Sequence, residues 1–254
     1  MSTIQHAPLI SHDPCQNYLL AALPADILAR LRTHLEIVQV SPGEILCRSG
    51  CKVKHVYFPI TSIVSLLYVT EEGEPTEVGL IGNEGFVGLA LILGGDSMPY
   101  QSVAQSAGHA YRLSGSLLMQ ELANSKPMRD LLLRYTQALF MQVGMLAVSN
   151  RFYSVEQKLC LWLLMLLDRI SSNELIGTHE MIANMLGVRR EGISEAANRL
   201  QRAGIIRYHR GRITVLDRSH LEAKVTADYQ LVKKEYARLI PDSQGDEYRF
   251  WKAT

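Results

Sequence analysis

The sequence lacks the cysteine patterns that mark metal-binding and disulfide-stabilised proteins. Its four cysteines are Cys15, Cys47, Cys51 and Cys160. Only Cys47 and Cys51 lie close together, and no second pair follows at the spacing of zinc ligands. An iron–sulfur cluster usually needs three or four clustered thiolates. We therefore expect free thiols in a reducing compartment, no metal site and no bound cofactor.

Long apolar runs are also missing. The longest run, Leu159 to Leu167, has nine residues and is closed by Lys158 and Asp168, whereas a membrane span needs about 20. The N-terminus, MSTIQHAPLISHDP, has no basic stretch followed by an apolar one, so it does not resemble a signal peptide. These absences predict a cytoplasmic protein with no membrane partner.

Catalytic signatures are absent as well. The sequence contains no G-x-S-x-G, no Walker A loop, no H-E-x-x-H and no H-x-H pair. The segment Gly82-Asn83-Glu84-Gly85 is rich in glycine, but no dinucleotide-binding helix pattern follows it. We therefore do not expect an enzyme, and binding functions become the leading hypotheses.

The clearest pattern present lies between Thr178 and Arg218 and begins as a helix-turn-helix. Thr178 can cap a first helix, and Gly187 can end it in a left-handed turn. A second helix follows, in which apolar residues recur at helical spacing. The apolar residues of the two helices are Met181, Ile182, Met185, Leu186, Ile193, Ala196, Ala197 and Leu200. The other face of the second helix is polar, as contacts with base edges and phosphates require.

A basic hairpin follows this pair of helices. Two strand candidates, Ile205–Tyr208 and Arg212–Leu216, flank the turn His209-Arg210-Gly211, which predicts the wing of a winged helix. Eight arginines lie between Leu186 and Arg218, opposed by three acidic residues, although the whole chain carries a formal charge of only +1. An arginine-rich face alone is common, but combined with the glycine turn and the hairpin it favours DNA binding.

The region before the predicted winged helix differs in its composition. Residues 1 to 17 are interpreted as a polar tail, and Tyr18 to Leu35 as a helical lead-in with Pro24 at a helix start. From Glu36 to Leu113, short β-prone runs alternate with glycine turns, which is typical of a β-sandwich or barrel. The strand candidates are Glu36–Val40, His55–Phe58, Ile63–Val69, Glu77–Ile81, Gln101–Gln105 and Ala110–Leu113.

A long helix is expected after Lys126-Pro127. Its residues recur at alternating steps of three and four over more than three heptads, which indicates a seam between helices. The residues of this stripe are Met128, Leu131, Tyr135, Ala138, Gln142, Met145, Ser149 and Phe152. A helix buried within one chain is the alternative. We favour a homodimer interface, because a winged helix on a palindromic DNA site also needs two-fold symmetry.

The chain is expected to break near Arg151–Ser154 and resume in a helix from Val155 to about Ile170, opened by a Ser154–Gln157 capping box. A last helix is expected from Thr226 to Ile240, ended by Pro241. The predicted domains are residues 18–125 (β-roll sensor), 126–152 (dimerisation helix), 153–225 (winged helix) and 226–254 (C-terminal helix and tail).

This order of domains resembles the Crp/Fnr family of bacterial transcriptional regulators over residues 18 to 225. The likeness is most specific in Leu186-Gly187-Val188-Arg189-Arg190-Glu191-Gly192-Ile193-Ser194 and in Gly85-Phe86-Val87-Gly88-Leu89-Ala90. It implies an α+β fold, with an N-terminal double-stranded β-roll of jelly-roll, cyclic-nucleotide-binding type, a long dimerisation helix and a C-terminal winged helix-turn-helix. It also implies sequence-specific DNA binding.

The resemblance identifies the start of the second helix as the part that reads DNA. It implies that Arg190 contacts phosphate or guanine, that Glu191 accepts from a cytosine amino group, and that Ser194 makes a further contact. Glu195 stands where the family often has arginine, so the DNA site should differ, and Arg189 or Arg199 is a candidate for the missing cation. The full predicted DNA-contacting set is Thr178, Arg189, Arg190, Glu191, Ser194, Glu195, Arg199, His209, Arg210 and Arg212.

The resemblance also places an effector pocket in the β-roll. The predicted lining is Gly85, Phe86, Val87, Gly88, Leu89, Ala90, Tyr100, Gln101 and Ser102. Cyclic-nucleotide-binding members have a Gly-Glu step followed about ten residues later by an arginine, but this chain has Gly88-Leu89 and no cation between Ser97 and Ser102. An unpaired phosphate would be costly to bury, so we expect no ordinary binding of cAMP or cGMP. Glu84 is a candidate for the lost carboxylate.

The predicted partners are double-stranded DNA, a second copy of the chain and an unidentified small-molecule effector, with RNA polymerase as a further candidate. The alternative is a ligand-binding or protein-interaction module that does not bind DNA. A haem ligand is less favoured, because a single histidine such as His55 or His109 in a β domain is more often structural.

Overall fold

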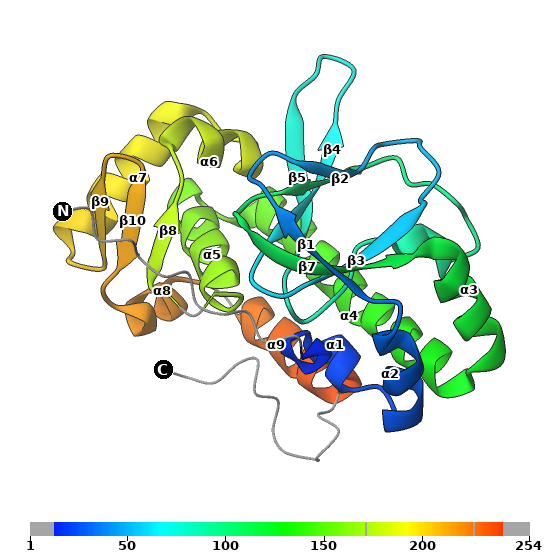
Figure 1. Cartoon of the computed structure of the whole chain (residues 1–254). Helices are drawn as coiled ribbons and strands as arrows, with labels where there is room; N and C mark the ends of the chain where they lie inside the picture. Colours follow the sequence, from blue (N-terminus) through cyan, green and yellow to red (C-terminus); the bar gives the residue numbers. More distant parts are fainter. Residues whose placement is uncertain (1–12, 171, 226, 241–254) are drawn as a thin grey trace, which may run out of the picture.

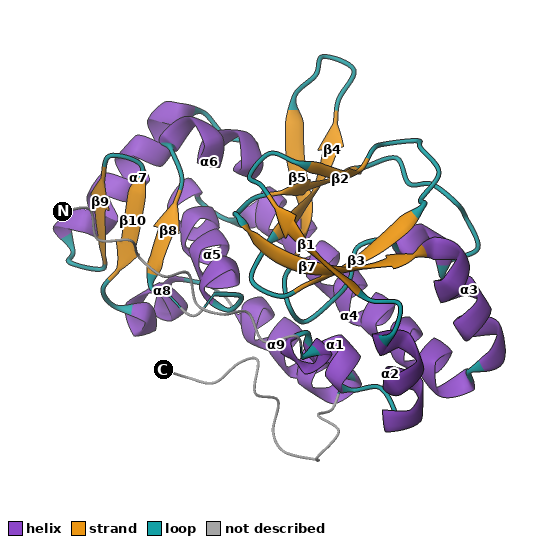
Figure 2. Ribbon diagram, viewed as in Figure 1, coloured by secondary structure: helices purple, strands orange, loops and turns teal. Residues whose placement is uncertain are grey.

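The computed structural model describes residues 13–240, apart from residues 171 and 226. Figure 1 shows a β-rich lobe and a smaller helical lobe on either side of the long helix α4 (Lys126–Phe152). Figure 2 shows that a small sheet belongs to the second lobe as well. The predicted α+β fold, with a β-roll, a long helix and a winged helix, is confirmed.

The β-roll is built from two antiparallel sheets. One has the strand order β1-β7-β3 and the other the order β2-β6-β4-β5. Their bounds are β1 (Glu36–Val40), β2 (Ile45–Cys47), β3 (His55–Pro59), β4 (Val64–Val69), β5 (Pro75–Ile81), β6 (Gln101–Ala104) and β7 (Gly108–Ser114). All six predicted strands are present. Strand β2 was missed, because three residues are too few to display an alternating pattern.

Side chains from both sheets meet in one core. Phe58 on β3 stacks on Phe86, with ring centroids 5.7 Å apart, and Val64 and Leu66 on β4 point into the same interior. The outer end of β4 is exposed, and the β4–β5 hairpin projects from the body of the lobe (Figure 1). Its turn includes Gly73, which has φ of 85° and therefore suits a residue without a Cβ atom.

The chain enters the β-roll through short helices. These are a 3₁₀ turn (Pro14–Gln16), α1 (Tyr18–Ala21) and α2 (Ala25–Arg32). Asn17 is buried and donates 2.9 Å hydrogen bonds to the carbonyls of Pro59 and Gly85. The predicted polar tail is therefore wrong for residues 13 to 17, where this asparagine anchors the chain to the β-roll. Residues 1 to 12 of that predicted tail lie outside the described residues.

A helix that the sequence did not predict, α3 (Gly115–Asn124), leads from β7 to α4. Its first residues, Gly115 and Ser116, are typical of a turn, which hid the helix. Gly115 is required for packing, because a Cβ atom there would lie 2.9 Å from Leu91 Cδ1 and 3.1 Å from the Lys54 carbonyl oxygen. The helix α4 then begins where it was predicted, with Ser125 as its N-cap and Pro127 in its first turn.

The predicted dimer stripe of α4 faces inward. Met128, Leu131, Tyr135, Ala138, Gln142, Met145 and Ser149 are all buried within the single chain. Gln142 accepts from the Leu80 N–H (2.7 Å) and donates to the Leu80 carbonyl (3.1 Å), so it completes the edge of β5. The assignment of these seven residues to a partner copy is therefore wrong, because other elements of the same chain, among them α3, β5 and α9, pack on α4. Of the eight, only Phe152 is exposed.

By length and average composition, α4 also meets the criteria for a candidate membrane span. The count of consecutive apolar residues had excluded such a segment, so that exclusion does not hold for α4. The buried part of this helix packs on protein, and its buried side chains include polar Gln142 and Ser149. This packing is that of a core helix.

The second lobe follows a short break at Tyr153. Its elements are α5 (Val155–Leu167), β8 (Glu174–Ile176), α6 (His179–Leu186), α7 (Arg190–Arg202), β9 (Ile206–His209), β10 (Arg212–Val215) and α8 (Arg218–Lys224). Helix α9 (Ala227–Leu239) follows this lobe. The Ser154–Gln157 capping box is confirmed, while α5 ends at Leu167 and not near Ile170. Strand β8 and helix α8 were missed. Thr226 and Pro241, the predicted limits of the last helix, lie outside the described residues.

Helix α9 leaves the second lobe and packs along α4, as Figure 1 shows. Tyr229, Val232, Tyr236 and Leu239 form its buried face. Arg134 on α4 donates a 2.8 Å hydrogen bond to the Leu239 carbonyl, and the Tyr236 hydroxyl lies 3.3 Å from Gln142 Nε2. The last described helix is thus part of the packing of the long helix.

Candidate DNA-binding surface and effector pocket

The helix-turn-helix forms as the sequence predicts. Thr178 Oγ1 accepts from the Met181 N–H (3.2 Å) at the start of α6. Gly187 ends α6 in a left-handed conformation with φ of 61°, and α7 follows. The apolar face of α7 is buried against α5 and α6 through Ile193, Ala196, Ala197 and Leu200. This packing leaves the opposite, polar face of α7 at the surface.

The exposed face of α7 carries both positively and negatively charged side chains. Arg189 occupies the N-cap, and Arg190, Glu191 and Glu195 are exposed. The nearest carboxylate to Arg190 is that of Glu180, 3.9 Å away and also exposed, so this contact is weak in water. The N-terminal end of α7 therefore presents the guanidinium groups of Arg189 and Arg190 to solvent, and the carboxylates of Glu191 and Glu195 follow.

Arg199, a predicted DNA contact, also forms ion pairs within the protein. Its Nε lies 2.7 Å from Glu156 Oε2 on α5, and Lys224 Nζ lies 2.8 Å from the other oxygen of that carboxylate. These hydrogen bonds, from Lys224 first and Arg199 second, lower the pKa of Glu156. Arg199 thus braces α7 against α5, and its Nη1 also lies 3.9 Å from Glu195 Oε2.

The wing is a tight two-residue hairpin. His209 pairs with Arg212, and the two residues between them, Arg210 and Gly211, have φ of 48° and 77°. Positive φ at both central positions is typical of a type I′ turn, which favours asparagine and glycine. Arg210 is the only non-glycine residue in the described part of the chain with positive φ. Its backbone is held in a disfavoured conformation while its side chain stays exposed.

The third strand of the wing sheet is β8, which the sequence did not reveal. The sheet has the order β8-β10-β9, and Glu174 on β8 lies 3.1 Å from Arg212 on β10. This ion pair ties Arg212 back to the sheet and leaves Arg210 as the freer cation at the wing tip. Exposed His209 flanks it.

His179 joins the two helices and the wing and was not predicted as a site residue. Its Nδ1 lies 2.8 Å from Ser194 Oγ on α7, and its ring stacks on Tyr208 of β9 at 4.3 Å between centroids. Burial lowers the pKa of His179, and the charge of Arg190 lowers it further, which favours the neutral ring. Only spatial proximity reveals this residue, since no sequence pattern connects positions 179, 194 and 208.

A small cavity lies in the β-roll where the resemblance implied an effector pocket, and its lining overlaps only in part with the predicted one. Phe86, Gly88, Leu89, Ala90, Tyr100 and Ser102 line it as predicted, together with Cys47, Arg48, Cys51, Val53, Leu66, Ile81, Met98 and Leu139. Gly85, Val87 and Gln101 lie outside this lining. The cavity has a volume of about 20 Å³, enough for a single water molecule. Small-molecule sites usually measure about 300–1,000 Å³, so this cavity is far smaller than an ordinary ligand site.

The chemistry of the lining is unlike a cyclic-nucleotide cassette. Leu89 takes part in the lining, which adds no carboxylate there, and the cation of the lining is Arg48. The turn that carries Arg48 lies against the segment where the arginine was expected, since the Gly50 N–H donates to the Met98 carbonyl (2.8 Å) and Ser49 Oγ donates to the Pro99 carbonyl (2.9 Å). Burial raises the pKa of Cys47 to about 11 and that of Tyr100 to about 12, so both remain protonated and neutral near pH 7. Cys15, Cys47, Cys51 and Cys160 are all free thiols.

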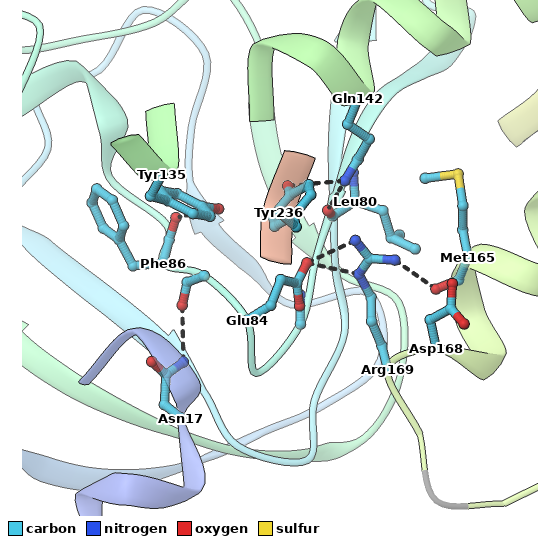
Figure 3. A network of polar contacts seen from close by, with 12 residues as sticks. Asn17, Leu80, Glu84, Phe86, Tyr135, Gln142, Met165, Asp168, Arg169 and Tyr236 are labelled. Carbon is cyan, nitrogen blue, oxygen red and sulfur yellow. Dashed lines mark hydrogen bonds and ion pairs between the residues drawn. The ribbon is translucent and has the colours of Figure 1, made fainter. Parts of the chain in front are cut away.

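Glu84 does not replace the lost effector carboxylate. It is fully buried and forms an ion pair with Arg169, just beyond α5, at 2.7 Å, with a second contact of 2.8 Å from Arg169 Nε (Figure 3). Arg169 also donates to the Met165 carbonyl (2.6 Å), and Glu84 accepts from the Gly82 N–H (2.9 Å). Burial raises the pKa of Glu84, and the charge of Arg169 opposes that rise.

This pair belongs to a buried polar network between the two lobes. On the β-roll side, the Tyr135 hydroxyl of α4 contacts the Phe86 carbonyl at 3.4 Å, and Phe86 lines the pocket (Figure 3). Gly85 permits this approach, because a Cβ atom there would lie 2.3 Å from the Tyr135 hydroxyl. On the other side, Asp168 beside Arg169 binds Arg218 and Tyr229. The pocket loop and the DNA-binding lobe are therefore connected through contiguous contacts.

Comparisons with known proteins agree with this architecture. Residues 37–125 match a sequence model of the cyclic nucleotide-binding domain, and residues 157–224 match one of the Crp-like helix-turn-helix domain. None of the curated proteins matches the chain in sequence.

Solved structures share the fold at low identity. A transcriptional regulator of the Crp/Fnr family from Eubacterium rectale is 21% identical, with a TM-score of 0.65 over 82% of this chain and 98% of that one. FixK2 from Bradyrhizobium japonicum is 16% identical, with a TM-score of 0.67 over 76% and 98% of the two chains. The c-di-GMP-responsive regulator CLP of Xanthomonas campestris is 17% identical, with a TM-score of 0.60 over 76% and 99%.

Proposed function

Since the chain belongs to the Crp/Fnr family of transcriptional regulators, we propose that it reads a specific DNA site as a homodimer through α7 and the wing. Transcription regulation by DNA binding is the function of this family and of this chain. The finer assignment rests on one observation. Packing buries one face of α7 and leaves Arg189, Arg190 and Glu191 exposed at its N-terminal end. A helix in this state can enter a major groove without rearrangement.

Within this proposal, some of the predicted residues contact DNA directly, and others hold the DNA-contacting surface in place. Arg190, Glu191, Ser194 and Glu195 face the base edges, with Arg189 near the backbone. Arg210 and His209 on the wing follow the phosphates, as does the Thr178 hydroxyl, whose oxygen already caps α6. Arg199 and Arg212 are braced by Glu156 and Glu174 and position the surface.

The homodimer uses another face of α4 than the predicted stripe. Leu133, Phe140, Val148 and Phe152 are exposed large apolar residues of this helix, and Phe140 and Phe152 are 74% and 75% exposed. Exposed Gly144 lies between them, where a second backbone can approach closely. Two such helices related by a two-fold axis would bury this surface and hold two copies of α7 at a fixed separation.

The small volume of the cavity and its lining without a carboxylate support the expectation that cAMP and cGMP do not bind in the ordinary way. An effector of other chemistry, a cytoplasmic location and contact with RNA polymerase remain part of the proposal. The protein would act by binding and not by catalysis.

The test is operator binding by the full chain. A preferred DNA site is first selected from a random duplex library, and affinities are then measured by fluorescence anisotropy at fixed salt. Arg190→Ala should weaken specific binding by about 1–3 kcal/mol if the contact is to guanine. Arg129→Ala, an exposed arginine on α4, is the matched control and should leave affinity unchanged. Failure of the wild-type chain to retain any duplex would instead favour a ligand-binding or protein-interaction module.

A further inference from the structure

Resting on the proposed role of α7, we propose that His179 makes Ser194 an acceptor-only reader of DNA. The side chain of Ser194 would then select a base that presents an exocyclic amino group in the major groove, adenine or cytosine, at the position it faces. A serine without such a restraint can either donate to a base or accept from one, and so discriminates poorly.

The restraint follows from the count of protons at Ser194. Its Oγ lies 2.8 Å from His179 Nδ1 and 3.2 Å from the Arg190 carbonyl oxygen. If Nδ1 carries no proton, it accepts the hydroxyl hydrogen of Ser194. If Nδ1 carries one, it donates to Oγ, and the hydroxyl hydrogen turns to Arg190. In both arrangements the single hydrogen of Ser194 is used inside the protein, and only lone pairs remain for DNA.

His179 is the stronger of the two restraints. Its contact is the shorter, and the Arg190 carbonyl already has a partner in the N–H of residue 194 within the α-helix. The imidazole is also fixed in place. Its ring stacks on Tyr208 at an interplanar angle of 21°, and the Tyr208 hydroxyl donates to the Gly177 carbonyl at 3.3 Å.

The surroundings leave His179 no competing partner among the described residues. Its Nε2 is buried without a hydrogen-bond partner. The imidazole therefore has one polar contact available, and it is the one to Ser194.

The neighbours of Ser194 extend the same chemistry along the helix. Glu191 lies three residues before Ser194 and four residues before Glu195. Residues at these spacings are neighbours on a helix surface, so Glu191 lies beside both Ser194 and Glu195 on α7. Ionised carboxylates only accept hydrogen bonds. After the two arginines, α7 thus presents acceptors at positions 191, 194 and 195, and this arrangement matches a run of base amino groups in the major groove.

The inference is tested by base preference and not by affinity alone. After selection of the DNA site, each base pair is replaced in turn, and the position that loses discrimination in Ser194→Ala is identified. At that position the wild-type chain should prefer adenine or cytosine over guanine or thymine by about 3- to 10-fold, the effect of one hydrogen bond.

His179→Phe keeps a ring for the stack on Tyr208 and removes the nitrogen. We expect it to reduce this preference to below about twofold at the same position only, while other positions keep theirs. His179→Asn, whose amide can again bond to Ser194, should restore the preference. The double variant His179→Phe, Ser194→Ala should match Ser194→Ala, because the histidine acts through the serine. If His179→Phe does not fold, His179→Asn still tests whether a hydrogen-bonding side chain at position 179 maintains the base preference.

Unchanged base preference in His179→Phe would overturn the inference, as would a wild-type preference for guanine or thymine at the Ser194 position. A purely structural role would appear as an equal loss of affinity for all sequences, and this too would overturn it. If Ser194→Ala changes no position while Arg190→Ala still abolishes selectivity, the inference fails and the proposed function stands. If no variant or wild-type chain selects a duplex, the proposed function itself fails.

Discussion

The buried ion pair between Glu84 and Arg169 is the contact whose loss should cost the most stability. Replacement of Arg169 by methionine removes the cation and its hydrogen bonds while keeping an unbranched apolar side chain. The Glu84 carboxylate, which has no exposed surface, would retain the Gly82 N–H at 2.9 Å. Removal of one partner from a buried pair leaves an uncompensated charge and costs about 3–5 kcal/mol.

A double-mutant cycle separates the pair from its surroundings. Glu84→Leu combined with Arg169→Met replaces both charges by apolar groups, which is often nearly neutral for a buried pair. We therefore expect the double variant to be more stable than Arg169→Met alone. The measurement is urea unfolding of the wild-type chain, both single variants and the double variant, followed by circular dichroism.

The pH dependence gives a second criterion. Without Arg169, burial raises the pKa of Glu84 with less opposition, so the folded state holds a proton that the unfolded chain releases. A raised folded-state pKa stabilises at low pH, and that stability is lost as pH rises through it. The deficit of Arg169→Met should therefore be larger at pH 8 than at pH 5. A deficit below about 1 kcal/mol, or additive single variants, would refute the account of a compensating buried pair.

Three further predictions concern the surface of the protein. Phe140→Glu should convert a dimer into a monomer, measured by light scattering, whereas Leu231→Glu on α9 should not; a dimeric Phe140→Glu chain would contradict the proposed interface. Arg210→Asn should relieve the positive φ at the wing tip and raise stability by up to about 1 kcal/mol, while reducing the salt dependence of DNA binding by about one phosphate contact. Unchanged salt dependence would remove Arg210 from the DNA surface. Calorimetry with cAMP should give no binding at micromolar concentrations, and saturable heat in that range would overturn the interpretation of Leu89.

The winged helix was predicted almost completely because its signals are local. Thr178 caps a helix, Gly187 ends it, and the pattern from Ile193 to Leu200 defines the buried face, all within a few turns of one another. Strand β8 was missed for the opposite reason. Its three residues acquire their role only by pairing with β10, which follows in the chain after both helices.

The errors at α4 and Glu84 have a common physical cause. The spacing of apolar residues indicates that one face of a helix is covered, but it does not indicate what covers it. Here Tyr135 packs on Phe86, and Gln142 bonds to Leu80 of β5 and to Tyr236 of α9, all within the same chain. Similarly, Glu84 and Arg169 are 85 residues apart, and nothing in the segment around either residue identifies the other as its partner.

The position of α9 has a consequence for synthesis of the chain on the ribosome. Gln142 emerges 94 residues before Tyr236, the side chain whose hydroxyl it contacts. Until Tyr236 leaves the exit tunnel, the nascent chain must carry this flank of α4 uncovered, although the β-roll can already be complete. Translation arrested before α9 should therefore yield a chaperone-bound, protease-sensitive α4 beside a protected β-roll.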